Sequence, residues 1–267
     1  MTKTPTSGFK FLNYKEENQT AIISINRPEV YNALNAAAKM EIVQALREAN
    51  KTPSVHSIIL TGEGKAFCTG QDLNDRSVQA SNGPIDLGNT LQTEWNPLVN
   101  AIRDSKKIVV AAVNGVCAGA GISIAIACDL IVARPEVKFM GAFSKLGLCP
   151  DAGSTYIFSR AMGYQKTMEF FLLGNPLTSE DMLSYGLVNK IGENALIAAI
   201  DYTDKINKLS PLSVEMIKKN IKTSLDSSFN ESMERETFAQ RFLGNSTDYK
   251  EGLTAFLAKR EPVFTGN

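Results

Sequence analysis

Short apolar runs separated by long helical patterns constrain the fold of this chain more than any other feature. Three such runs are typical of buried strands: 21–25, 58–60 and 108–113. Residues 36–50 place Met40, Val43 and Leu46 at helical spacing, and residues 121–127 are apolar on every side, as in a central helix. Strands joined through helices run parallel, because a parallel pair needs a long crossover. The pattern therefore predicts an α/β fold.

The composition argues against several classes of protein. The 28 Lys and Arg residues balance the 28 Asp and Glu residues, so no net charge attracts nucleic acid or anionic lipid. No apolar run reaches the roughly 18 residues that span a bilayer. The single histidine, His56, precedes a strand and is interpreted as structural, and the four cysteines form no CxxC pair. We expect a cytoplasmic protein with reduced thiols and with no metal, nucleic-acid or membrane partner.

The second half of the chain predicts a change of architecture. Between residues 75 and 97, a polar stretch precedes Leu87, Leu91 and Trp95, which recur every four residues and predict a loop followed by a helix that covers a pocket. Beyond about residue 193 the strand patterns stop and helical patterns follow one another. We therefore expect a core of residues 1–192 that holds the site and a helical C-terminal subdomain of residues 193–267.

Two segments place small residues where a strand ends, namely 67–72 and 114–121. The sequence contains no P-loop and no GxSxG motif, so phosphate-cradling and serine-hydrolase chemistries lose their usual signatures. The first N–H groups of a helix have no intrahelical partner and attract negative charge. If the backbone N–H groups of Gln71 and Ala120 converge, they form an oxyanion hole. The alternative is that these small residues only permit close packing of helix on strand.

Carboxylates near these turns are candidates for proton transfer. Asp151 lies in the segment Pro150-Asp151-Ala152-Gly153, just before a predicted helix at Ser154. It is either a general base or a residue that caps this helix. Asp72 and Asp75 form another possible pair, but on a loop we expect them to be solvated.

Taken together, these segments resemble the crotonase, or enoyl-CoA hydratase/isomerase, superfamily. The resemblance covers nearly the whole chain, and its motifs occur in the family's order: 26–34, 67–73, 114–129, 146–153 and 255–264. It implies a spiral of ββα units, a helical C-terminal trimerisation region and a homo-oligomer that is a trimer or a dimer of trimers. It also implies an acyl-CoA thioester as substrate, so that coenzyme A is part of the substrate and no separate cofactor is needed.

The resemblance also implies which residues form the site. The two oxyanion donors fall on the N–H groups of Gln71 and Ala120, and the aspartate of several family isomerases falls on Asp151. Substrate-binding positions fall on the following residues: Thr69, Gly70, Asp72, Leu73, Asn74, Gly119, Phe143, Phe256 and Lys259. Phe256 and Lys259 are similar to residues that reach a neighbouring subunit's adenine site.

The departures from the family pattern favour isomerisation. Family hydratases carry two glutamates, and Ser123 and Phe143 occupy those positions here. A hydroxyl and a phenyl ring do not perform carboxylate acid–base chemistry. The resemblance is greatest to isomerases of phenylacetate degradation, which convert a ring epoxide of phenylacetyl-CoA to an oxepin and are also associated with double-bond shifts in enoyl-CoA.

Three other functions stay open from the sequence. A lone Asp151 could activate water weakly, as in a hydratase. It could instead act as a nucleophile, as in a dehalogenase or hydrolase of the superfamily, although His56 is poorly placed to activate water. A third alternative is a non-catalytic protein that binds CoA, RNA or a protein partner. The balanced charge gives no support to RNA binding.

Overall fold

The computed structural model describes residues 8–75 and 86–267, and its larger sheet has six strands in the order β1-β2-β3-β5-β7-β10. The bounds of these strands are β1 Leu12–Glu17, β2 Thr20–Ile25, β3 Ser57–Gly62, β5 Ile108–Val113, β7 Leu130–Ala133 and β10 Lys190–Ile191. Neighbouring strands are parallel except β1 and β2. The three predicted strands are confirmed as β2, β3 and β5.

A smaller sheet has four short strands in the order β4-β6-β8-β9. These are β4 Ala66–Cys68, β6 Val116–Ala118, β8 Lys138–Met140 and β9 Leu177–Thr178. Three successive strand pairs, β3 and β4, β5 and β6, and β7 and β8, share one arrangement. In each pair the first strand joins the large sheet, the second joins the small sheet, and a helix follows. The chain therefore shows the expected recurrence of strand, strand and helix.

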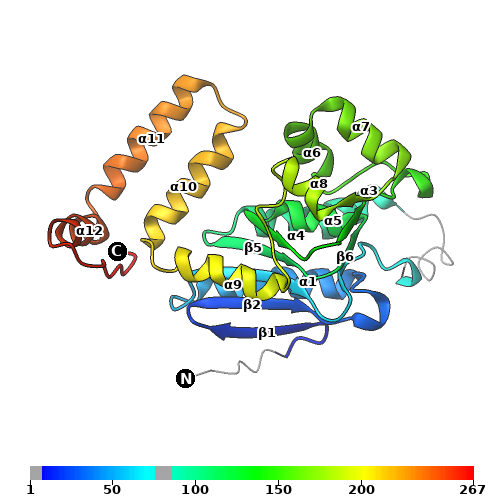
Figure 1. Cartoon of the computed structure of the whole chain (residues 1–267), viewed down its shortest axis with the longest axis horizontal. Coiled ribbons are helices and arrows are strands. Elements are labelled where there is room, and N and C mark those ends of the chain that lie inside the picture. Colours follow the sequence, from blue (N-terminus) through cyan, green and yellow to red (C-terminus); the bar gives the residue numbers. More distant parts are fainter. Residues whose placement is uncertain (1–7, 76–85) are drawn as a thin grey trace.

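The helices divide into those on the sheets and those beyond them (Figure 1). Their bounds are α1 Ala36–Lys51, α3 Leu87–Thr90, α4 Asn96–Arg103, α5 Ala120–Ala127, α6 Ser154–Met162, α7 Tyr164–Leu173, α8 Ser179–Ser184, α9 Ala195–Ile206, α10 Pro211–Ser224, α11 Phe229–Leu243 and α12 Thr247–Leu257. Short 3-10 helices span Pro28–Val30 and Ser144–Leu146. All eight residues of α5 are buried, which confirms the predicted central helix.

Alternate residues of the large sheet face two different layers. Val109 and Ala111 pack in the main core with α1, α4 and α5, whereas Val110 and Ala112 pack against the buried face of α9. This alternation follows from the two-residue period of a strand. Because helices cover both faces, the central strand β5 is apolar at every position.

Helix α1 corrects one expectation from the sequence. Met40, which the helical pattern assigned to the buried face, is 66% exposed. Its neighbour Lys39 is 1% exposed and faces inward beside Ile42 and Val43. Val43 and Leu46 are buried as the pattern predicts, so the prediction is wrong for Met40 alone.

The segment expected to cover a pocket is helical where the structure describes it. Residues 76–85, which include most of the predicted loop, lie outside the described residues. Beyond them, α3 continues into a π-helix, Leu91–Trp95, which leads directly into α4. Single π-helical turns often occur at functional sites, because the inserted residue changes where side chains point.

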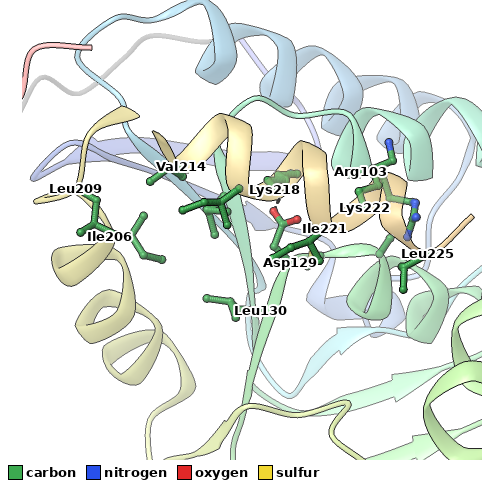
Figure 2. A pocket seen from close by; sticks show the side chains of 14 residues that line it. Arg103, Asp129, Leu130, Ile206, Leu209, Val214, Lys218, Ile221, Lys222 and Leu225 are labelled. Atoms are coloured by element: carbon green, nitrogen blue, oxygen red, sulfur yellow. Dashed lines mark hydrogen bonds and ion pairs between the residues drawn. The ribbon is translucent and has the colours of Figure 1, made fainter. Parts of the chain in front are cut away.

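Helices α10, α11 and α12 stand to one side of the sheets (Figure 1). Helix α9 lies after the predicted boundary at 192/193 but packs on the large sheet. Helix α10 is connected to the core by an ion pair at 2.7 Å between Nζ of the buried Lys218 and Oδ2 of Asp129, whose side chain is 21% exposed. A cavity of about 400 Å³ lies between α10 and the core, and Figure 2 shows Lys218 and Asp129 meeting there. Within the described residues, no helix is long and apolar enough to cross a membrane.

Candidate active site

The segment that carries Gln71 is held by the motif near residues 26–34. The Asn32 side chain is fully buried and donates to the carbonyl oxygens of Glu63 and Ala66 at 2.9 and 2.7 Å. Leu34 N donates to Gly70 O at 2.7 Å, and Asp72 N donates to Leu34 O at 3.0 Å. These bonds form a single parallel bridge between Leu34 and Gln71. The motif therefore has a structural role: it fixes the backbone on both sides of Gln71.

Gly70 brings this segment against the start of α5. Its φ is +87°, and a Cβ at this position would lie 2.9 Å from Ala120 N and 3.2 Å from Ala118 O. Only glycine adopts this conformation and this approach without strain. Gly70 directly precedes the first predicted donor, Gln71, and its own backbone lies against the second predicted donor, Ala120.

The two predicted donors have their N–H groups available. Among the described residues, neither Gln71 N nor Ala120 N donates a hydrogen bond to another backbone or side-chain group. For Ala120 this follows from its place in the first turn of α5, where N–H groups have no intrahelical acceptor. Gly119 precedes it with φ +52°. The geometry fits the predicted oxyanion hole, in which both amides stabilise a developing negative charge.

The approach of α5 to the strands depends on a second glycine. A Cβ on Gly121 would lie 2.1 Å from Cys68 O, at the end of β4. Burial raises the pKa of the Cys68 thiol to about 12, so this side chain is neutral at physiological pH. The predicted close packing of helix on strand is thus present together with two amides that have no acceptor among the described residues, and the two interpretations do not exclude each other.

Asp151 is attached to the same helix through its backbone. Ser123, fully buried in α5, donates from Oγ to Asp151 O at 3.1 Å. Ser123 lies three residues after Ala120, so the two residues share one face of the helix. The Asp151 side chain is half-buried, with its Oδ1 atom inside the protein. The structure therefore brings Asp151 to the turn of α5 that provides the Ala120 amide.

Asp151 is not the N-cap residue of the helix that follows. Gly153 holds that position, with φ +84°. Asp151 O instead accepts from Ser154 N at 3.0 Å and from Ser154 Oγ at 2.8 Å. The backbone of Asp151 is thereby fixed from two helices, which limits the positions that its carboxylate reaches.

The oxygen of the Gln71 side chain is held by two donors, and the sequence connected neither of them with Gln71. Lys39 Nζ and Trp95 Nε1 both donate to Gln71 Oε1, at 2.9 and 3.2 Å. Lys39 also forms an ion pair with Glu94 and lies 4.6 Å from the centroid of the Trp95 ring. The sequence signal for this contact was Lys39 itself, because the helical period of α1 predicts a buried residue at that position. Trp95 was expected to cover a pocket, and it is fully buried.

Asp72 corrects the expectation of a solvated carboxylate. It is 6% exposed, and its Oδ2 forms an ion pair with Arg27 at 2.8 Å. Its Oδ1 accepts from Asn74 N at 3.1 Å. The Asp72 side chain thus stabilises the segment, and only its neighbours Leu73 and Asn74 are exposed. Thr69, on the other side of Gly70, donates to Tyr31 O at 3.1 Å.

Phe143 lies within an aromatic cluster. It is buried, and its ring meets the edge of Phe171 at 6.1 Å between centroids. Phe171 in turn packs on Phe158 and Phe170. A cavity of about 630 Å³ lies against Phe171 and the residues just before Asp151, including Leu148, Cys149 and Pro150. Apolar space is therefore present beside the segment that carries Asp151.

Two predicted binding residues lie far from this cluster within the chain. Phe256 is on α12 and is 80% exposed, and Lys259 follows on the same surface. Figure 1 places α12 on the opposite side of the molecule from α5. A single subunit therefore does not bring Phe256 and Lys259 to Gln71, Ala120 and Asp151. No group of metal-ligating side chains occurs in the part of the chain that the structure describes.

The chain belongs to the enoyl-CoA hydratase/isomerase family, whose profile matches residues 15–267. It is 35% identical over 259 residues to 1,2-epoxyphenylacetyl-CoA isomerase of Escherichia coli K12, which covers 96% of this chain and 99% of the relative. It is also 35% identical over 262 residues to a probable enoyl-CoA hydratase of Rhodobacter capsulatus, covering 96% of this chain and 98% of the relative.

A solved structure confirms the predicted crotonase-like fold. The crystal structure of an enoyl-CoA hydratase from Polaromonas sp. JS666 matches with a TM-score of 0.91 at 29% identity, covering 95% of this chain and 99% of that chain. The family membership predicted from the motifs is therefore confirmed. The relatives include both isomerases and hydratases, so the family alone does not decide between the two reactions.

Proposed function

We propose that this protein is an acyl-CoA isomerase that moves a proton with Asp151 while the Gln71 and Ala120 amides hold the thioester oxygen. The observation that carries the proposal is the hydrogen bond from Ser123 to Asp151 O. This bond supports the proposal because it holds the backbone of Asp151 beside the turn of α5 that provides the Ala120 amide. Its donor, Ser123, stands where hydratases of the family have a glutamate, and a hydroxyl does not act as a carboxylate base.

For a 3-enoyl thioester, the reaction needs only these groups. Asp151 accepts the proton from C2, and the electrons of the C2–H bond pass to the thioester oxygen, which the two amides stabilise. The electrons then return, the double bond moves to C2–C3, and Asp151 delivers its proton to C4. Coenzyme A enters as part of the substrate, so the reaction needs no separate cofactor.

Similarity to the Escherichia coli isomerase supports a ring-epoxide thioester of phenylacetate degradation as the more specific substrate. The same similarity extends to a hydratase at equal identity, which makes hydration the second candidate. For hydration, the half-buried Asp151 would have to activate water without either glutamate of the family's hydratases. The buried Phe143 occupies the position of one of these glutamates and leaves no carboxylate there.

The test is a substrate panel in deuterated water, read by mass spectrometry. We expect phenylacetyl-CoA epoxide or a 3-enoyl-CoA to isomerise without net addition of water. Crotonyl-CoA that gains water, with neither of the other two reacting, would support the hydratase instead. A covalent adduct on Asp151 would support the nucleophile mechanism.

The variant Asp151→Asn tests the role of the carboxylate. It should lower kcat by about 10²- to 10⁴-fold, because general acid–base catalysis contributes a factor of that size. Thioester binding should change little, since the amides stay in place. Asp201→Asn, an exposed aspartate paired with Lys190 on the far layer, is the control and should keep full activity. An Asp151→Asn enzyme with the rate of the wild type would refute the mechanism.

A further inference from the structure

A charged side chain occupies a buried position next to the proposed oxyanion hole. Lys39 is among the largest side chains that the fold buries completely. Transfer of an ammonium group out of water is unfavourable unless close partners compensate for it. An apolar residue at this position of α1 would pack without that penalty. The arrangement of the partners of Lys39 therefore indicates what the charge does.

These partners converge on the side chain of Gln71. The Lys39 ammonium donates to Gln71 Oε1 at 2.9 Å and is neutralised by Glu94, which comes from the π-helix. The next residue, Trp95, donates its Nε1–H to the same oxygen at 3.2 Å. A bond from a charged donor is stronger than one between neutral groups. Gln71 Oε1 is thus held between α1 and the π-helix.

The other end of the Gln71 side chain is also bonded. Its Nε2 donates to Asp72 O at 3.3 Å, within the same segment. Two donors at the oxygen and one acceptor at the nitrogen fix the side-chain torsions. The Gln71 backbone N–H is one of the two proposed oxyanion donors. A residue whose side chain is fixed at both ends has little freedom to reorient this N–H.

We propose that Lys39, held by Glu94, is a positioning residue of the oxyanion site, which acts through the Gln71 side chain to keep the Gln71 N–H aligned. This inference rests on the proposed function, because it concerns one of the two amides of that mechanism. Lys39 does not touch substrate. Its effect is geometric, and a misplacement of about 1 Å in such a site lowers the rate by about a hundredfold.

The test uses acetoacetyl-CoA, whose enolate shares its negative charge between the thioester and ketone oxygens and absorbs in the near ultraviolet. An aligned pair of amides stabilises the bound enolate and increases its absorbance. We expect Lys39→Met to weaken enolate binding about tenfold to a hundredfold and to lower kcat by a similar factor. Binding of acetyl-CoA, which does not ionise, should change less than about threefold, so the loss falls on kcat and not on KM.

Lys218→Met is the matched control. Lys218 is also a buried lysine with one carboxylate partner, Asp129, but it lies on α10 and does not contact Gln71. Its loss should lower stability while the ratio of enolate binding to acetyl-CoA binding stays that of the wild type. If Lys218→Met lowered this ratio as much as Lys39→Met, general destabilisation would account for both, and the inference would be refuted.

A double-variant cycle tests whether Lys39 acts through Gln71. Gln71→Ala removes the side chain but keeps the backbone N–H. If the inference is correct, Lys39→Met combined with Gln71→Ala weakens enolate binding no further than Gln71→Ala alone. Independent losses that add together would overturn it. Should Lys39→Met fail to fold, Trp95→Phe removes the second donor to Gln71 Oε1 and should weaken enolate binding in the same sense, and an unchanged Trp95→Phe enzyme would contradict the inference.

The same measurements separate this inference from the proposed function. A wild-type protein that does not stabilise the enolate would refute the oxyanion hole and the inference with it. A wild-type protein that stabilises the enolate, with Lys39→Met equal to it, would leave the proposed function intact and refute the role of Lys39.

Discussion

At the residue scale, Gly70 is a position where the addition of one methyl group should have a large catalytic effect. In Gly70→Ala the new methyl group would lie 2.9 Å from Ala120 N, and the backbone would be held at φ +87°. Relief of this contact moves the two amides apart, so we expect kcat to fall by about a hundredfold. Steady-state kinetics, with the substrate that the wild type isomerises, measure the effect on kcat.

Gly186→Ala separates the contact from the backbone strain. Gly186 also has positive φ, +72°, but a Cβ there would meet nothing within 4 Å. It should lower stability by about 1 kcal/mol, as alanine does in a left-handed conformation, and should leave kcat unchanged. Equal losses of activity in the two variants would show that strain, and not the contact with Ala120, is responsible.

The ion pair of Arg27 and Asp72 should contribute to folding more than to chemistry. Both side chains are nearly buried, and Arg27 also donates to Ala33 O at 2.5 Å. Arg27→Met leaves Asp72 as an uncompensated buried charge, so the free energy of unfolding should fall by about 3–5 kcal/mol. Urea denaturation measures this. The double variant Arg27→Met with Asp72→Asn should recover part of the loss, and a double variant as unstable as the single one would contradict this explanation.

The residues of the proposed site differ in how far the sequence predicts them. Gln71 and Ala120 could be named because each follows small residues at the end of a strand. Asp151 could be named because it lies in a turn-forming segment before a helix and at the aspartate position that the family resemblance implies. Lys39 could not, since a lysine on a helix is usually exposed and its partners are far along the chain. The ion pair of Asp72 escaped prediction for the same reason: a loop carboxylate gives no indication of a buried arginine 45 residues earlier.

At the element scale, apolar runs were sufficient to predict β2, β3, β5 and α5. The small sheet was not predicted, because strands of two or three residues are too short to show a repeated pattern. Its strands form through pairing with distant segments, as β4 does with β6. The π-helix at Leu91–Trp95 is likewise set by tertiary contacts, since its sequence has an ordinary helical spacing.

Lys107 should produce a pH dependence of stability at the end of α1. Its Nζ donates to Ala49 O and Thr52 O at 2.5 and 2.7 Å, and burial lowers its pKa from 10.5 to about 8. Between these two values the unfolded chain binds more protons at this site than the folded protein, so the free energy of unfolding should rise with pH. Below about pH 8 both states carry the charge, and this contribution is constant.

The variant Lys107→Met isolates this effect from other titrating groups. The stability of the wild type relative to Lys107→Met should increase as the pH is raised from about 8 to about 10.5. Chemical denaturation at a series of pH values measures the difference. A difference that is flat or falls across this range would show that the pKa of Lys107 is not lowered.

At the scale of the whole molecule, α10 to α12 carry apolar side chains that a lone subunit leaves exposed. They include Phe229, Phe238, Tyr249, Phe256 and Leu257. Exposed apolar surface on this scale is unusual for a monomer and marks an interaction surface. Together with the distance of Phe256 and Lys259 from α5, it supports the proposed homo-oligomer, in which one subunit completes the site of its neighbour.

Subunit complementation tests that arrangement directly. Asp151→Asn removes the proposed base, and Phe256→Ala removes a side chain that we propose to reach the neighbouring subunit. Each variant alone should be weakly active. In a cyclic trimer assembled from both at random, about one quarter of the sites combine an intact Asp151 with an intact Phe256 from the neighbour. Coexpression should therefore restore about a quarter of the wild-type activity.

The complementation result is interpretable only beside the oligomeric state. Sedimentation should give a trimer or a multiple of it for the wild type, for both variants and for their mixture. Phe229→Ser, at another exposed position on α11, should shift the protein towards smaller species. A shared site recovers activity whenever an intact Asp151 and an intact Phe256 meet across the interface. If the mixture shows only the mean activity of the two variants, Phe256 acts within its own subunit or has no role in the site.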